Sequence, residues 1–199
     1  MRTPMQSRSE TSAEQMVSAA LALLEEGGVG AVTIAAVATR SGISNGALYH
    51  RFGDRSGLLR AAQDQVLGTI EAETADAFDL ADAEPDDDRA TRLLAQAALS
   101  IFAEHRGAMR AFLVETREQQ PFRERTEQSS HLIGALVTGW LITRFDTSPA
   151  DADAAYRMLF ALGAAQALFD DAQVSPRPVE PGTFADAIAR ALSAVARRS

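Results

Sequence analysis

The segment from Thr33 to Phe52 most restricts what this chain can fold into. It reads TIAAVATRSGISNGALYHRF. Thr33 and Ser44 are suitable N-caps for two short helices, and Gly42 suits the left-handed turn between them. The apolar residues that would lock these helices together are Ile34, Val37, Ala38, Ile43, Leu48 and Phe52. The segment therefore predicts a helix-turn-helix, in which the second helix is able to enter a DNA major groove.

The residues expected to face outward from the second short helix support this interpretation. They are short or flat hydrogen-bonding groups that would approach phosphates without repulsion: Ser44, Asn45, Gly46, Tyr49 and His50. Spacing alone leaves alternatives open, because short helices joined by a glycine turn also occur as ordinary packing in helical proteins. Tyr49 would then be a core aromatic residue and His50 an exposed residue without a partner.

The rest of the chain also has a helical pattern, because no stretch alternates with period two for long. We predict an all-α fold of about nine helices. Thr11 and Glu14 have the spacing of a capping box, which predicts that the first helix starts at Thr11 after a flexible arm, residues 1–10. The expected helices are 11–27, 34–41, 45–52, 55–79, 88–106, 108–119, 121–145, 149–171 and 183–197.

Composition excludes several classes of protein. The chain has 199 residues, 46% of them apolar, which is enough for a buried core. Its longest nearly apolar stretch, 159–169, falls well short of the roughly twenty residues of a membrane span. No cysteine is present, so disulfides are excluded, and no signal peptide is recognisable. We therefore expect a cytoplasmic protein that has no membrane partner.

Charge is distributed unevenly along the chain. Residues 1–60 hold six arginines against five acidic residues, a net charge of +1, whereas residues 61–199 hold thirteen against twenty-two, a net charge of −9. The overall charge of −8 would argue against a nucleic-acid partner if it were spread evenly. Because only the first sixty residues need to meet phosphate, DNA contact is expected to be confined to them.

From about Ser12 to Leu59 the sequence resembles the TetR family of transcriptional regulators. Thirteen positions agree in type and spacing: Thr33, Ile34, Ala35, Ser41, Gly42, Ile43, Ser44, Gly46, Leu48, Tyr49, Phe52, Leu58 and Leu59. Two positions depart from the pattern. Arg51 stands where family members commonly have His or Tyr, and Arg55 stands where they commonly have Lys.

The resemblance implies a three-helix DNA-binding domain at 11–54 and an effector-binding and dimerisation domain at 55–199. Carried over by position, Thr33, Tyr49 and Arg55 would grip phosphates, so that Arg55→Ala would weaken binding to all DNA sequences alike. The candidates for contacts with base edges are Ser44, Asn45, Ala47 and His50, with Gly46 allowing close approach.

The resemblance also implies a homodimer on a palindromic operator, with an interface on the last two helices. Its candidate residues are Leu159, Gly163, Ala167, Phe184, Ile188 and Leu192. A small organic effector would bind in a pocket enclosed by the fourth to the eighth helices and tilt the fourth helix to release the operator. Candidate pocket walls are Phe102, Met109, Phe112, Leu113, Leu136, Trp140 and Phe160, each of which could equally be filled core. Candidate polar anchors are His131, Gln166 and Glu115.

Two other classes remain as alternatives. An enzyme is disfavoured because the three histidines, His50, His105 and His131, are not paired at metal-ligand spacing, and no nucleophile or nucleotide-binding motif appears. We expect no catalytic residues, no metal and no cofactor. A helical adaptor or ligand-binding protein that does not bind DNA could have the same helices, and operator selection from a random DNA library distinguishes it.

Overall fold

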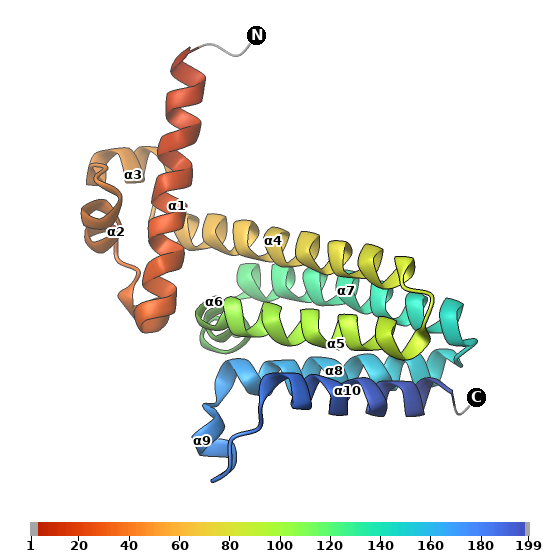
Figure 1. The fold of residues 1–199 in the computed structure, drawn as a ribbon. Coiled ribbons are helices and arrows are strands. Elements are labelled where there is room, and N and C mark those ends of the chain that lie inside the picture. Colours follow the sequence, from red (N-terminus) through yellow and green to blue (C-terminus); the bar gives the residue numbers. More distant parts are fainter. Residues whose placement is uncertain (1–3, 198–199) are drawn as a thin grey trace. The chain divides into compact units, whose positions relative to one another are not determined.

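The computed structural model describes residues 4–197, with side chains from Thr11 onward except at position 171. The described residues form ten α-helices and one π-helical turn and contain no strand, which confirms the predicted all-α class. In chain order the elements are α1 (Pro4–Ala31), α2 (Ile34–Ser41), α3 (Asn45–Phe52), α4 (Arg55–Ala83), α5 (Asp87–Glu104), α6 (Arg106–Arg110), the π turn η1 (Ala111–Glu115), α7 (Gln120–Phe145), α8 (Pro149–Leu168), α9 (Asp171–Val174) and α10 (Pro181–Ala196) (Figure 1).

The chain divides into two compact units. Unit 1 comprises Met1–Gly68 and Gly107–Thr126, and unit 2 comprises Thr69–Arg106 and Glu127–Ser199. α4 and α7 each run through both units. The sequence predicted a boundary between residues 54 and 55, whereas unit 1 also includes the start of α4, most of α6 and the start of α7. Within the described part of the chain, no helix is long and apolar enough to cross a membrane.

The helix boundaries around the predicted helix-turn-helix follow from local capping. Thr33 Oγ1 accepts a hydrogen bond from the N–H of Ala36 at 3.1 Å, and Ser44 Oγ accepts one from the N–H of Ala47 at 3.3 Å. Gly42 has φ +71°, the left-handed conformation expected of a tight turn. These contacts confirm the predicted starts of α2 and α3, because each depends only on residues within three positions of the cap.

Other helix boundaries differ from the prediction. α1 begins at Pro4, so residues 4–10 of the expected arm are helical and Thr11 lies inside the helix instead of capping it. A proline is tolerated in the first turn of a helix, and the polar residues that follow it do not interrupt one. Residues 1–3 of that arm lie outside the described part. The predicted helix 108–119 is replaced by α6 and η1, because the N–H of Thr116 bonds to the carbonyl of Ala111 in the π pattern.

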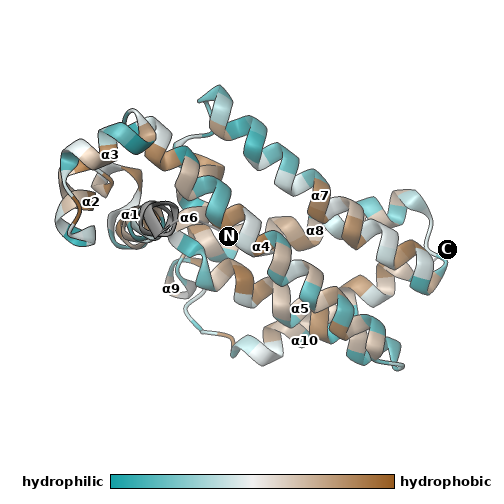
Figure 2. Ribbon diagram, turned by 90° about the horizontal axis from the view of Figure 1, so that it is seen from above, coloured by the Kyte–Doolittle hydropathy of each residue, from teal (hydrophilic) through white to brown (hydrophobic). Residues whose placement is uncertain are grey.

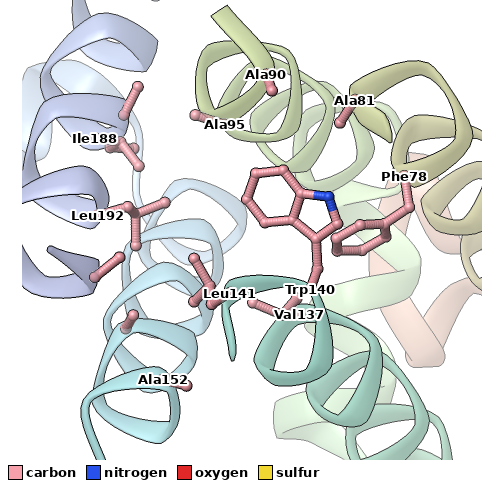
Figure 3. Close-up of a cluster of buried hydrophobic side chains, with 13 residues drawn as sticks. Phe78, Ala81, Ala90, Ala95, Val137, Trp140, Leu141, Ala152, Ile188 and Leu192 are labelled. Atoms are coloured by element: carbon pink, nitrogen blue, oxygen red, sulfur yellow. The ribbon is translucent and has the colours of Figure 1, made fainter. Parts of the chain in front are cut away.

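Unit 2 is built around one apolar cluster to which α4, α5, α7, α8 and α10 contribute. α10 packs against α5 and α8. Trp140 lies beside Phe78 (Figure 3), with ring centroids 6.1 Å apart. Its indole N–H donates to Asp82 Oδ1 at 2.7 Å. Figure 2 shows that α7 is hydrophilic over its first half and largely apolar over its second half, which supplies Trp140 to this core.

Candidate nucleic-acid interface

α2 and α3 pack against each other, and each carries a side chain that water does not reach. Val37 on α2 and Leu48 on α3 are both completely buried, and α2 also packs against α1. Burying a Val or Leu side chain contributes about 1.5–3 kcal/mol. The packing of α3 against α2 therefore fixes which residues of α3 face outward, as the apolar spacing predicted.

The outward side of α3 carries most of the predicted DNA-contacting residues. Thr33, Ser44, Asn45, Gly46 and His50 are exposed, and Ala47 is half-buried. Tyr49 is also exposed, to 55%, so it is not the core aromatic residue that the alternative interpretation required. Seven of the eight predicted residues thus belong to one short segment, Thr33–His50, and present hydroxyl, amide, imidazole and phenol groups without a carboxylate.

The two capping hydroxyls remain able to bind a further group. Thr33 Oγ1 and Ser44 Oγ each accept a backbone N–H. A hydroxyl that accepts a hydrogen bond still carries its own proton, which it can donate to a phosphate or base oxygen. Capping and DNA contact are therefore compatible at both positions.

Arg55, the eighth residue, has a different environment from the one its position in the family pattern suggested. Its Nε donates to the carbonyl of Val32 at 2.5 Å, and its Nη2 donates to the carbonyl of Val29. Arg55 is half-buried, and its guanidinium ties the first residue of α4 to the last turn of α1 and to Val32, which follows α1. The predicted phosphate contact is untested, and the structure adds an internal role for this side chain.

The last turn of α1 is also held by Glu115, at the end of η1. Glu115 Oε2 accepts the N–H of Val29 at 2.9 Å. A Cβ on Gly28, which has φ +65°, would lie 2.8 Å from the other carboxylate oxygen. In return, Glu25 near the end of the regular part of α1 accepts the N–H of Gly107 at 2.7 Å. Glu115 was a candidate effector anchor, but its carboxylate binds the segment α1–α3, here called the head, within unit 1.

The arginines nearest to α3 differ in how far they are neutralised. Arg40 on α2 pairs with Glu26 at 2.6 Å, so its charge is largely offset. Arg51 lies in the last turn of α3, next to His50, and is exposed. In the sequence, Arg51 was recognisable only as a departure from the family pattern and not as a candidate for DNA contact. Its exposure makes it the cation of the segment that is best presented to solvent.

The predicted effector-binding residues are distributed over both units. Phe102 and Phe160 meet edge to face in unit 2, with centroids 6.3 Å apart, whereas Trp140 belongs to the apolar cluster around Phe78. Phe112 stacks on Phe122 in unit 1. Of the other three, Met109 is buried and Leu113 half-buried in unit 1, and Leu136 is 38% exposed on α7. The fold divides the predicted walls between its two units.

Most of the predicted dimer-interface residues belong to the interior of unit 2. Gly163, Ala167, Ile188 and Leu192 are buried. Leu159 and Phe184 are partly buried and pack against the apolar cluster. The four buried residues are core within a single chain and are not available to a partner. The outward sides of these helices carry other residues: Ala154, Met158 and Ala161 on α8, and Ala187 and Ala194 on α10.

Comparison with known proteins is consistent with this geometry. Residues 16–62 match the model of bacterial regulatory proteins of the tetR family. The HTH-type transcriptional regulator BetI of Burkholderia thailandensis is 43% identical over 61 residues, which cover 31% of each chain. BetI of Stenotrophomonas maltophilia is 41% identical over 54 residues, or 27% of this chain and 28% of the relative. The match spans about a third of the relatives' length.

Solved structures extend the likeness of fold to nearly the whole chain. A transcriptional regulator from Rhodococcus sp. Rha1 has a TM-score of 0.75 at 20% identity, covering 92% of this chain and 95% of the other. A tetR-family regulator from Mesorhizobium loti has a TM-score of 0.73 at 18% identity, covering 94% and 98%. These relatives are named as transcriptional regulators. The segment 16–62 thus matches the TetR family of bacterial regulatory proteins, and the chain as a whole shares its fold with solved regulators.

Proposed function

We propose that the protein is a sequence-specific, DNA-binding transcriptional regulator that inserts α3 into the major groove of a palindromic operator. The observation that carries the proposal is the exposed polar side of α3, a helix that packs against α2 and whose Leu48 is completely buried. A rigid helix with outward amide, imidazole and phenol groups suits the reading of base edges. The regulator would act in the cytoplasm.

Each side chain is assigned by its position and exposure. Asn45 and His50 read base edges, Ser44 donates its hydroxyl proton, and Ala47 contacts a thymine methyl group. Thr33 and Tyr49 hold phosphates and fix the register of the helix in the groove. Arg51 supplies the cation that Arg55 was expected to supply, because the guanidinium of Arg55 is bound to backbone carbonyls.

Replacing Asn45 by Ala is expected to lower operator affinity by about 1–3 kcal/mol, or roughly 5- to 150-fold, because one bidentate base contact is lost. Preference at one base position should relax at the same time. The measurement is operator selection from a random DNA library, followed by anisotropy titration of the selected site and of that site with single-base changes. Gln128→Ala, which removes an exposed amide in unit 2, is the control and should bind as the wild type does.

Two outcomes of this experiment would contradict the assignments. If the wild-type chain enriches no DNA sequence, the proposal is wrong, and the alternative of a helical adaptor or ligand-binding protein gains support. If an operator is found but Asn45→Ala binds it with unchanged affinity, the assignment of α3 as the reading helix is wrong.

We propose that the regulator is a repressor released by a small organic effector. Two features support this. α4 runs continuously from Arg55 in unit 1 into unit 2, and unit 2 contains an aromatic group, Phe102, Tyr156 and Phe160. Burial raises the pKa of the Tyr156 phenol above its usual value, so the group stays protonated and donates to the carbonyl of Ser130 at 2.6 Å. Release requires that the effector bind the DNA-free chain more tightly than the operator-bound chain.

We propose that two copies associate through the outward sides of α8 and α10. One recognition helix reads only a few base pairs, and a dimer would present two heads to half-sites about 34–36 Å apart, or a multiple of this. The exposed alanines Ala154, Ala161, Ala187 and Ala194 support this surface, because small side chains let helices from two copies approach closely. The dimer remains a proposal, now assigned to these residues in place of the buried ones.

Ala161→Arg is expected to convert the dimer to a monomer and to weaken operator binding, because a charged, bulky side chain would have to be buried between two helices. Light scattering at micromolar concentration should give twice the 21.2 kDa chain mass for the wild type and the single mass for the variant. Ala72→Arg, at an exposed alanine of α4, is the matched control and should remain a dimer. A monomeric wild-type protein would refute the proposal.

A further inference from the structure

Three side chains of unit 2 that can bind a metal ion meet between α4 and the end of α5. Glu73 lies on α4, Glu104 is the last residue of α5, and His105 is the C-cap of that helix. His105 Nε2 lies 2.9 Å from Glu73 Oε2, and one donor atom from each of the three residues lies within 4.8 Å of the other two. None of the three residues belongs to the proposed DNA-contacting, effector-binding or dimer-interface residues.

The termination of α5 explains how two consecutive residues reach the same point. Neighbouring residues on a helix point about 100° apart, so they do not normally share a partner. His105 leaves the helical conformation, with φ −104° and ψ 26°, although its N–H still bonds to the carbonyl of Ile101. The cluster was not recognisable from the sequence, because no two of its three residues have the i, i+4 spacing of ligands on one helix.

The donor set suits a transition metal of the zinc type. Zn²⁺ takes imidazole nitrogen and carboxylate oxygen at about 2.0–2.2 Å, and a tetrahedral arrangement separates such ligands by about 3.3 Å. The observed 2.9 Å between His105 and Glu73 would have to widen by only about 0.4 Å. Two carboxylates and a neutral imidazole carry two negative charges, which a divalent cation neutralises. The negative end of the α5 dipole favours a cation at the same place.

The surroundings leave this position open to an ion. The side chains of His105 and Glu73 are 18% and 36% exposed, so they are partly withdrawn from water, while Glu104 is exposed. The neighbouring cation in the sequence, Arg106, is directed elsewhere. It pairs with Asp170 at 2.7 Å and donates to the carbonyl of Ala167. Three protein ligands leave a fourth position for water or for a group from a bound molecule.

We propose that Glu73, Glu104 and His105 form a Zn²⁺-binding site that joins α4 to the end of α5. The proposal is independent of the DNA-binding function, because all three residues lie outside the head and the binding of Zn²⁺ can be measured without an operator. It also replaces the expectation from sequence that the chain has no metal site.

Isothermal titration of the full-length, tag-free protein with ZnCl₂ tests the site. The expected result is one Zn²⁺ per chain, with binding weakened at least about 10- to 100-fold in His105→Ala, since even the loss of a residue that only orients a metal ligand has an effect of that size. Mg²⁺ should not compete, because it prefers six oxygen ligands. His131→Ala removes an exposed histidine of α7 outside the cluster and should bind Zn²⁺ as the wild type does.

Thermal unfolding provides a second measurement. Excess Zn²⁺ should raise the Tm of the wild type and of His131→Ala but not that of Glu104→Gln, because a ligand stabilises the state that binds it. Glu104 is exposed, so its replacement keeps the test valid even if His105→Ala fails to fold. The proposal is overturned if the wild type shows no saturable Zn²⁺ binding, or if Glu104→Gln and His105→Ala bind Zn²⁺ with wild-type affinity.

Discussion

Gly163→Ala is expected to lower the free energy of unfolding by about 1–3 kcal/mol, although alanine is the better helix former. A Cβ at this position of α8 would lie 2.2 and 2.3 Å from two ring carbons of Phe102. That ring is held edge to face by Phe160, so it has to move out of an established contact to make room. The steric cost therefore exceeds the gain of about 0.5–1 kcal/mol that alanine brings to a helix interior.

The matched control is Gly139→Ala on α7. No atom lies within 4 Å of a Cβ built there, so only the helix propensity acts and the variant should be more stable by about 0.5–1 kcal/mol. Chemical denaturation of the two variants beside the wild type gives the comparison, and the two changes should have opposite signs. Stabilisation by both substitutions would show that Gly163 is not in tight contact with Phe102.

Arg55→Ala is expected to destabilise the protein by about 1.5–3 kcal/mol, because hydrogen bonds from a charged donor to the carbonyls of Val29 and Val32 are lost. Val29 and Val32 come shortly before Thr33, the N-cap of α2. The start of α2 should therefore loosen, and operator affinity should fall for all DNA sequences. Arg51→Ala, at an exposed position of α3, is the comparison and should change stability by less than about 0.5 kcal/mol.

The salt dependence of operator binding separates the internal role of Arg55 from a phosphate contact. Each lost phosphate contact reduces the slope of log K against log salt by about 0.9. We expect Arg51→Ala to reduce the slope and Arg55→Ala to leave it unchanged, so that the latter acts on the fold of the head. A reduced slope for Arg55→Ala with unchanged stability would restore the phosphate role that the family pattern suggested.

The two dimer-interface assignments show why a periodic pattern cannot identify an interface by itself. Ile188 and Leu192 are spaced as a helix stripe requires, and a stripe packs equally well against another helix of the same chain or of a partner. In the structure that stripe faces α5 and α8 and is buried, and the outward side of α10 carries Thr183, Ala187, Arg190 and Ala194. Only the tertiary packing distinguishes the two sides.

The starts of α2 and α3, the left-handed turn at Gly42 and the burial of Val37 and Leu48 follow from the sequence alone. Each of the caps and the turn involves residues at most three positions apart, where side-chain chemistry and backbone geometry leave few alternatives. For the same reason the segment was recognisable as a helix-turn-helix.

What holds that segment in place was decided by the tertiary structure. Val29 binds Glu115, which lies 86 residues away, and Arg55, which lies 26 residues away. The cluster of Glu73, Glu104 and His105 likewise depends on where α5 ends beside α4. Such contacts leave no spacing in the sequence, because they depend on how helices pack and not on which residues follow one another. The sequence therefore determined the helix-turn-helix, and the packing of distant segments determined its supports.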